Sequence, residues 1–409
     1  MPLMLLFIIA ILFFCFLRRD DFFSVFKLFS LIYIALFYAI PLIFLQGKDG
    51  FLYGWAYHYF NDEEYSLAIL ALIVFLSGFL IADFLRWRFS KENICTHQQS
   101  ISEVFNAPRF ILLLLCAVLL SAYFWWSGVA ENSFEGRQGL VEISVFELLF
   151  RLIVYNLVIA MVFVSISNGK RSLVVLAFVC LAICAVSLGG RARLLLLLSF
   201  LAIYSFKIKL NLLALLGVGA FVVLGPVIFN LKEITYQLIV LKEMPDVWGY
   251  YASGFDVSDF FNNATHPLVS MVKVQGIIDE IGYRYFYDYI QGVLFYLRAF
   301  GLPISDSLTY FNTENILGVR TSIIPPGYLA FGYVQLGLVG VFVSGIFYYL
   351  VGVLCERIYT ALQLNNNVAK FYFCVLAAST FYHGEIRVMV LTFIVPLVVI
   401  ASSVRFCRK

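Results

Sequence analysis

Apolar residues follow one another along this chain in long continuous runs, separated mostly by short polar connections. A run of roughly 15 to 25 such residues can cross the hydrocarbon core of a bilayer as a helix. Only helices and closed barrels satisfy their backbone there, and continuous rather than alternating runs favour helices. The pattern predicts an all-α polytopic integral membrane protein with about eleven transmembrane helices. The predicted spans are residues 2–17, 22–45, 66–85, 110–127, 145–167, 173–188, 194–206, 210–231, 326–355, 368–382 and 388–404.

One long segment, residues 232–325, breaks this series and is rich in tyrosine, phenylalanine and acidic side chains. We therefore predict a single integral membrane domain over residues 1–409, with this segment as a large loop that contains helices. Residues 267–299 predict two helices broken near Gly282, the second lying in the interface or dipping into the membrane. The ninth span is long and the seventh is short, which favours tilt or a re-entrant start in that region.

Composition supports the membrane assignment. Hydrophobic residues make up 62% of the chain, charged residues only 13%, and the mean hydropathy is +0.93. A soluble core of 409 residues needs more polar surface than this. The long loop carries ten acidic and six basic residues, a net charge of about −4, which disfavours a nucleic-acid partner.

Lysine and arginine in short connections collect on the cytoplasmic side of a membrane protein. If Arg18 and Arg19 lie inside, alternation places most of the basic residues in the short connections inside as well. The N-terminus is then periplasmic, the C-terminus cytoplasmic and the long loop extracytoplasmic. The first run lacks a basic leader, so we expect a retained span rather than a cleaved signal peptide.

The eight cysteines lie in spans or near predicted inner helix ends, and they imply no disulfide framework. Cys180 and Cys184 share one helical face with no histidine nearby in sequence, which favours packing over metal binding.

Two cations, Arg191 and Arg193, lie in a short outer turn against the usual charge bias. They either contact lipid phosphates at the interface or form a site for an anionic ligand, since guanidinium groups suit phosphate oxygens. By contrast, Glu147 and Arg151 are spaced four apart on one helix and are expected to form a structural ion pair.

The last outer turn places His383, Glu385 and Arg387 within five residues, together with Gly384. Charged groups beside the membrane are candidates for function, although Glu385 and Arg387 could pair for structural reasons alone. In the long loop, His266 could cap the helix that follows it, serve a surface role or act as a base. The loop aromatics, including Trp248 and Tyr251, could stack on sugars or form an interfacial belt.

No Walker loop, dinucleotide fingerprint, zincin helix or nucleophile elbow is present, so any reaction is expected to use a substrate that arrives activated. The late large loop, the turn of residues 189–193 and the segment of residues 321–340 together resemble the Wzy-type O-antigen polymerases, which join oligosaccharide repeat units. The arginine-to-glycine spacings of some members' loops are not evident here. Gly327, Gly332, Gly337 and Gly340 also suit close helix packing.

The resemblance implies a GT-C-like, metal-independent glycosyltransferase without a cofactor in the bacterial inner membrane. An undecaprenyl diphosphate-linked glycan would be the donor and an undecaprenyl diphosphate-linked repeat unit the acceptor. A polysaccharide chain-length regulator is a further expected partner. The leaving diphosphate needs cations at the outer boundary, for which Arg191, Arg193, Arg298, Arg320 and Arg387 are available. The acceptor hydroxyl needs a base, for which Glu385, His383 and His266 are candidates.

Two other functions stay open. An O-antigen ligase has similar topology and chemistry but transfers glycan to the lipid A core. A flippase or other transporter of lipid-linked oligosaccharide is expected to show internal repeats and polar residues along a midplane path. The sequence shows no repeat, and its exceptional charges lie on the predicted outer side.

Overall fold

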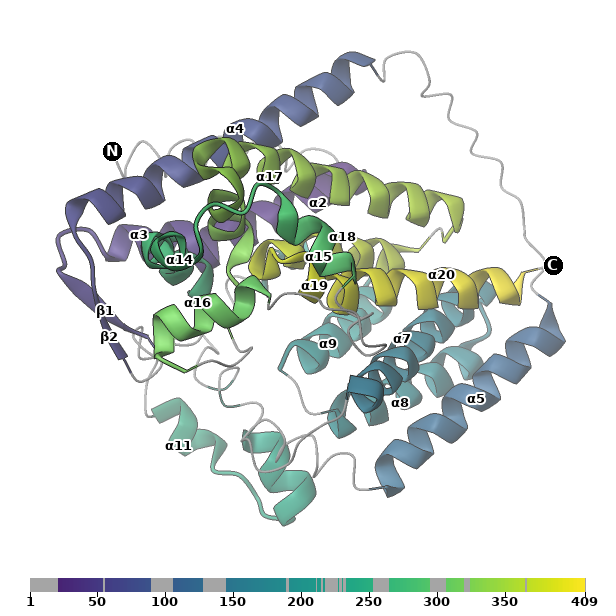
Figure 1. The fold of residues 1–409 in the computed structure, drawn as a ribbon. Helices are drawn as coiled ribbons and strands as arrows, with labels where there is room; N and C mark the ends of the chain where they lie inside the picture. Colours follow the sequence, from purple (N-terminus) through teal and green to yellow (C-terminus); the bar gives the residue numbers. More distant parts are fainter. Residues whose placement is uncertain are drawn as a thin grey trace. The chain divides into compact units, whose positions relative to one another are not determined.

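The computed structural model describes an all-α membrane protein with one short β-hairpin (Figure 1). The described residues are 21–53, 56–89, 106–127, 145–188, 191–210, 212–214, 216–217, 227, 230, 233–252, 265–294, 307–319, 324–364 and 366–408. The chain forms two compact units, described separately below. The first contains residues 1–98, 257–356 and 374–393, and the second contains the rest.

The first unit begins with an apolar helical segment made of α2 (Phe22–Ile34), η1 (Ala35–Ala39) and α3 (Ile40–Phe44). The Asp21 carboxylate caps it by accepting the Ser24 N–H at 2.7 Å. Helix α4 (Asp62–Phe89) starts at a capping box in which Asn61 and Glu64 each accept the other's backbone N–H. Local sequence thus fixes where both helices begin.

Helix α17 (Gly327–Ala361) is interrupted at Leu336 and Gly337, whose backbone angles are not helical. The two parts fold back on each other, because a Cβ on Gly332 would meet Ser344 Oγ at 2.5 Å and the Gly340 carbonyl oxygen at 2.7 Å. The expectation of close packing is confirmed for Gly327, Gly332 and Gly340, whereas Gly337 has only ordinary contacts and lies at the break. A short first arm followed by a long membrane-spanning arm is also the shape expected of a re-entrant start.

The long arm of α17 packs closely against α4 through glycine. A Cβ on Gly345 would overlap the Phe75 carbonyl, and one on Gly78 would overlap the Phe342 carbonyl. Small residues at such crossings let helix backbones approach and gain dispersion contacts within lipid. Around the crossing lie buried aromatic rings, among them Phe75 and Tyr348 with centroids 5.7 Å apart.

Four short helices of the long loop belong to this unit: α13 (His266–Val272), α14 (Val274–Ile281), α15 (Tyr287–Leu294) and α16 (Leu308–Leu317). The predicted break near Gly282 is confirmed, since this glycine ends α14 at a φ of 68°, but the first of the two predicted helices is itself divided at Lys273 into α13 and α14. Helices α18 (Asn367–His383) and α19 (Ile386–Met389), followed by η5 (Val390–Ile394), carry the last turn. The hairpin strands are β1 (Gly50–Tyr53) and β2 (Ala56–Tyr59).

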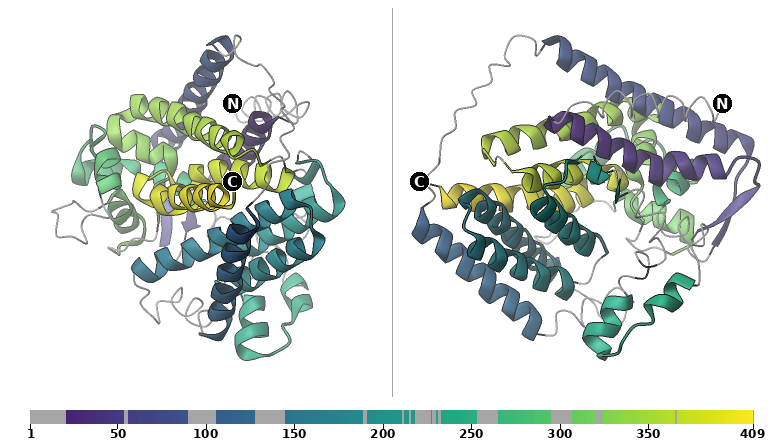
Figure 2. Two further views of the ribbon diagram at one scale, coloured as in Figure 1. Left: turned by 90° about the vertical axis from the view of Figure 1, so that its right-hand side faces the viewer. Right: turned by 180° about the vertical axis from the view of Figure 1, so that it is seen from behind.

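The second unit is built around a bundle of α5 (Ala107–Trp126), α7 (Val145–Asn168), α8 (Arg171–Ser187), α9 (Arg191–Phe206) and α20 (Val395–Cys407). Helix α7 packs against α8 and α20, and α8 packs against α5 and α9 (Figure 2). Two short elements, η3 (Gln237–Leu241) and α11 (Val247–Ala252), also belong to it. The expected ion pair between Glu147 and Arg151 is confirmed.

Six helical segments of the described part are long and apolar enough to cross a membrane, and α8 and α9 are shorter apolar helices. These eight segments coincide with predicted spans, apart from small differences at their ends. The tenth predicted span, residues 368–382, corresponds to α18, which is not among these apolar segments, and the first predicted span and most of the eighth lie outside the described residues. The multi-pass helical class is therefore confirmed, whereas the count of eleven and the single-domain organisation stay predictions.

Candidate functional site

A tight turn between α18 and α19 lies against the start of α13 and the start of α17. Gly384 adopts a φ of +65°, and a Cβ at this position would overlap the backbone of Gly327. Gly327 in turn lies against Pro267, whose Cβ would be 2.9 Å from an added Cβ. Glycine is needed at position 384 both for its left-handed backbone and for this close approach. The turn is thereby held at a junction of three elements.

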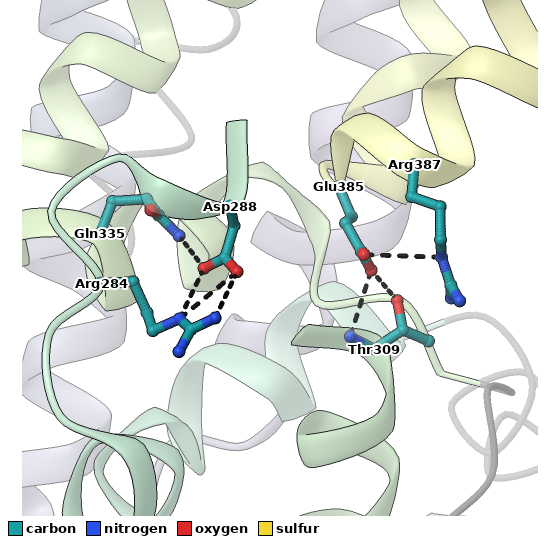
Figure 3. Close-up of polar contacts among 6 residues, drawn as sticks. All are labelled: Arg284, Asp288, Thr309, Gln335, Glu385 and Arg387. Carbon is teal, nitrogen blue, oxygen red and sulfur yellow. Dashed lines mark hydrogen bonds and ion pairs between the residues drawn. The ribbon is translucent and has the colours of Figure 1, made fainter. Parts of the chain in front are cut away.

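Glu385, in this turn, is held by donors from two directions (Figure 3). Its Oε2 accepts the backbone N–H of Thr309 at 3.1 Å and also the Thr309 hydroxyl, while Oε1 lies 3.6 Å from Nε of Arg387. Glu385 is only 2% exposed and Arg387 only 7%. The Arg387 guanidinium also lies 5.3 Å from the centroid of the Tyr310 ring. Residues at the start of α16 and α19 thus fix both charged groups.

Burial raises the pKa of the Glu385 carboxyl above its ordinary value, because removal from water disfavours the charged form. Arg387 and the Thr309 hydroxyl oppose this rise, and the nearby Asp288 carboxylate adds to it. The pKa of Glu385 therefore depends on how well its donors are placed.

His266 is the first residue of α13 and is buried rather than on the surface. Its Nε2 donates to the Tyr382 carbonyl at 2.8 Å, and its ring meets the Tyr382 ring at 3.7 Å between centroids. The expectation that His266 caps the helix or has a surface role is wrong, since the backbone leaves Thr265 at the cap position and the imidazole reaches across to α18. Burial, which disfavours the charged imidazole, lowers the pKa of His266 to about 3.

His383 is the last residue of α18, and burial lowers its pKa to about 4. Its Nδ1 is buried and has no hydrogen-bond partner among the residues that the structure describes. The ring is neutral at pH 7, and in the tautomer protonated at Nε2, Nδ1 can accept a proton. The His383 ring also lowers the pKa of His266, so the two imidazoles lie near each other.

A second charged group lies beside this turn, on α15 (Figure 3). Asp288 accepts from Arg284 at 3.1 Å and from the Gln335 side chain at 2.8 Å. The backbone N–H groups of Arg284 and Tyr285 cap the carbonyls of Val334 and Gln335, where the first arm of α17 ends. The loop before α15 thereby closes the break in α17.

Helix α15 also packs closely against α19, since a Cβ on Gly292 would lie 2.8 Å from the Ile386 Cβ and 3.0 Å from the backbone nitrogen of Arg387. The first unit thus brings the three sequence-predicted bases and Arg387 to the turn after α18 in two groups, His266 beside His383 and Glu385 beside Arg387 and Thr309. We call His266, His383, Glu385, Arg387 and Thr309 the polar centre.

The remaining predicted site residues are placed as follows. Arg193, in the second unit, donates to the Leu188 carbonyl at 2.8 Å, and its guanidinium lies 5.5 Å from the Tyr155 ring centroid. Trp248 is 80% exposed on α11. The helical backbone of Arg191 and Tyr251 is described but their side chains are not, and Arg298 and Arg320 lie outside the described residues. A common site for Arg191, Arg193 and Arg387 stays a prediction.

Sequence reasoning missed Thr309, and it counted Asp288 only toward the loop's charge. Asp288 follows Arg284 by four residues, a spacing that could have indicated the pair. Among the described residues no group of three or more histidine, cysteine or carboxylate side chains is arranged to hold a metal ion. Cys184 instead packs in the bundle of the second unit, 3.3 Å from the Ser121 hydroxyl.

We compared the chain with known protein families, curated proteins and solved structures. No family model matches the chain, and neither the curated proteins nor the solved structures contain a match.

Proposed function

We propose that this protein polymerises lipid-linked O-antigen repeat units, transferring the growing glycan from undecaprenyl diphosphate to an incoming undecaprenyl diphosphate-linked unit. The observation that carries the proposal is the polar centre itself. At the turn between α18 and α19 a buried carboxylate pairs with a guanidinium and accepts from α16, and two neutral imidazoles from α13 and α18 lie beside each other. Buried charged groups in a membrane protein are expensive and are expected to serve function.

Each side chain has a distinct role in this proposal. Arg387 lies at the start of α19 and would bind the departing diphosphate, whose negative charge grows in the transition state. Glu385 fixes Arg387, because both of its oxygens are already engaged. His266 supports the turn, since its Nε2 proton is committed to the Tyr382 carbonyl. His383 is left with an open nitrogen and is the preferred general base.

The reaction is a substitution at the anomeric carbon of the donor glycan. The acceptor hydroxyl oxygen forms the new glycosidic bond, the bond from the anomeric carbon to the diphosphate oxygen breaks, and its electron pair leaves with the diphosphate. The hydroxyl proton passes to Nδ1 of His383 and then to solvent. Because a base with a pKa of about 4 gives little driving force, stabilisation of the leaving group is expected to contribute more.

The number of membrane spans and the orientation of the chain in the membrane are part of the same proposal. The chain would cross the bacterial inner membrane eleven times in a GT-C-like arrangement, with the N-terminus periplasmic and the C-terminus cytoplasmic. The loop of residues 232–325 would then be extracytoplasmic, and the turn that carries His383 would face the same side. The bias of basic residues toward the cytoplasm would place this turn at the periplasmic surface, and the polar centre would meet the lipid-linked substrates there.

Deletion and complementation test the function. Loss of the gene should leave single repeat units on the lipid A core, and the wild-type gene should restore a ladder of longer chains. Arg387→Lys should fail to restore it at normal expression, because lysine lacks the planar, bidentate donors that suit a diphosphate. Arg405→Lys, at an exposed arginine of α20, is the matched control and should restore the ladder. Loss of all O-antigen on deletion would instead indicate a ligase or a flippase.

The break in α17 favours a second candidate, transport of lipid-linked oligosaccharide. Discontinuous helices at the substrate site are typical of secondary transporters. If the protein were a flippase, vesicles containing it would move the lipid-linked unit across the bilayer without releasing undecaprenyl diphosphate. Release of the diphosphate without movement of the unit would exclude this candidate.

A further inference from the structure

The β-hairpin of the first unit has one buried and one exposed face. Strand β2 pairs antiparallel with β1, and Tyr59 lies opposite Gly50. Tyr53 and His58 are buried at 8% and 7% exposure, whereas Tyr57 and Tyr59 are 53% and 71% exposed. Alternate residues of a strand point to opposite faces, so the two tyrosines share the outer face. We call this face of Tyr57, Tyr59 and Gly50 the tyrosine face.

The tyrosine face is aromatic where a solvated strand is expected to be polar. The rings of Tyr57 and Tyr59 are 4.9 Å apart at an interplanar angle of 64°. Gly50 adds no side chain beside them, and a Cβ there would lie 2.7 Å from the Tyr57 ring. A two-stranded hairpin is marginally stable on its own, and exposed rings bury little surface that would stabilise it. Folding of the hairpin therefore does not explain these two tyrosines.

Polar contacts connect this face to helix α16. The Tyr59 carbonyl accepts from the Lys273 ammonium, which also lies 3.3 Å from Glu64. The Lys273 carbonyl in turn accepts from the Asn315 side chain at 2.7 Å. Strand β2 also packs directly against α16. The hairpin is therefore fixed to α16 rather than projecting alone.

The same helix carries Thr309, which binds Glu385 in the polar centre. Thr309 and Asn315 are six residues apart, which is about 9 Å along a helix axis. The contact of Thr309 with Glu385 and the contact of Asn315 with the Lys273 carbonyl thus lie near opposite ends of one short helix.

We propose that the tyrosine face binds the glycan of the lipid-linked substrate while its anomeric end lies in the polar centre. This inference rests on the proposed function. Sugars present apolar C–H faces that stack on flat rings, and hydroxyls that bond to groups such as those of Lys273 and Glu64. These two groups are partly exposed next to β2, with side-chain exposures of 23% and 24%. A lipid chain would gain nothing from an ion pair beside the rings, which favours a glycan as the occupant.

Kinetics of purified protein in proteoliposomes test the site. The double variant Tyr57→Leu/Tyr59→Leu keeps apolar surface but removes the rings, and Tyr57→Phe/Tyr59→Phe keeps them. Loss of each stacked ring is expected to weaken binding roughly threefold to tenfold, so the leucine variant should raise KM at least tenfold with little change in kcat. The phenylalanine variant should stay within about threefold of wild type. Tyr123→Leu, at a tyrosine of α5 that is 54% exposed, is the control and should behave as wild type.

An unchanged KM in the leucine variant, or a fall in kcat alone, would overturn the inference. A Tyr59→Trp reporter gives an independent result, with oligosaccharides released from the producing strain's surface polysaccharide as the probe. Emission that responds to the oligosaccharides and resists quenching by brominated lipid supports a glycan site. Emission quenched by brominated lipid and indifferent to oligosaccharide assigns the rings to the membrane interface instead.

The two proposals fail in distinguishable ways. If His383→Gln and Arg387→Lys abolish polymer formation while the hairpin variants leave it unchanged, only the glycan site is wrong. If neither set of variants changes polymer formation, the proposed function is wrong as well.

Discussion

Replacement of Thr309 by valine removes one donor from Glu385 and leaves the shape of the side chain nearly unchanged. The Thr309 hydroxyl donates to Glu385 Oε2, and the variant loses this donor while it keeps the backbone N–H at 3.1 Å on the same oxygen. Both residues are buried, so a methyl group replaces the hydroxyl without admitting water. The lost hydrogen bond stabilises the charged carboxylate more than the neutral carboxyl group. Its removal therefore raises the pKa of Glu385 further.

The size of the effect follows from the strength of the lost contact. A hydrogen bond to a charged group contributes about 1.5 to 3 kcal/mol, and each pH unit corresponds to about 1.36 kcal/mol. In the proposed mechanism, ionised Glu385 fixes Arg387. The acidic limb of the pH profile for polymer formation should therefore move toward alkaline pH by roughly one to two units.

The assay is the rate of polymer formation in proteoliposomes from about pH 5 to pH 9. Thr309→Ser should keep the wild-type profile, because serine retains the hydroxyl. Thr392→Val is the matched control, since the Thr392 hydroxyl donates within its own helical turn, to the Val388 carbonyl at 2.9 Å. A Thr309→Val profile that superimposes on that of wild type would refute the assignment of Glu385 as the group that fixes Arg387.

Four further predictions follow from other features of the molecule. Gly384→Ala should lower stability by about 1 to 3 kcal/mol more than Gly318→Ala, because both have positive φ but only the former overlaps a neighbour; equal thermal unfolding temperatures in detergent would contradict this. Because the pKa of His266 is about 3 when folded and near 6.5 when unfolded, stability should fall as pH drops from 6.5 toward 3; His266→Gln should flatten this dependence, measured by thermal unfolding. Trp248→Ala and Tyr251→Ala should each shorten the polymer while membrane insertion stays normal, and normal chain length would assign both rings to an interfacial belt. A cysteine that replaces Ser253 should react with an impermeant thiol reagent added from outside, whereas a cysteine that replaces Lys409 should not. The reverse pattern would contradict the proposed topology.

Much of the fold could be predicted from the sequence because hydropathy acts locally. Each run long enough to cross a bilayer must satisfy its own backbone as a helix, so the described spans agree with the predicted ones. Near the ninth span the sequence predicted only tilt or a re-entrant start, not a break at a particular residue. Leu336 and Gly337 lie within an apolar run, and a glycine there fits a straight packed helix as well as a turn.

The candidate site was predictable where chemistry is dense in sequence. His383, Glu385 and Arg387 fall within five residues, and the structure places them in one turn. Thr309 could not be identified, because its role depends on a contact across 76 residues and a threonine hydroxyl is common in such loops. The burial of His266 likewise depends on α18, which the local sequence does not show.

Reconstitution is the strongest test of glycan transfer between two lipid-linked substrates. Purified protein in proteoliposomes would receive only the undecaprenyl diphosphate-linked repeat unit of the producing strain, with no lipid A core and no other protein. We expect glycans of two or more repeat units on undecaprenyl diphosphate, one undecaprenyl diphosphate released for each bond formed, and neither product with Arg387→Lys. Repeat units that stay single, with no diphosphate released, would contradict the proposed function.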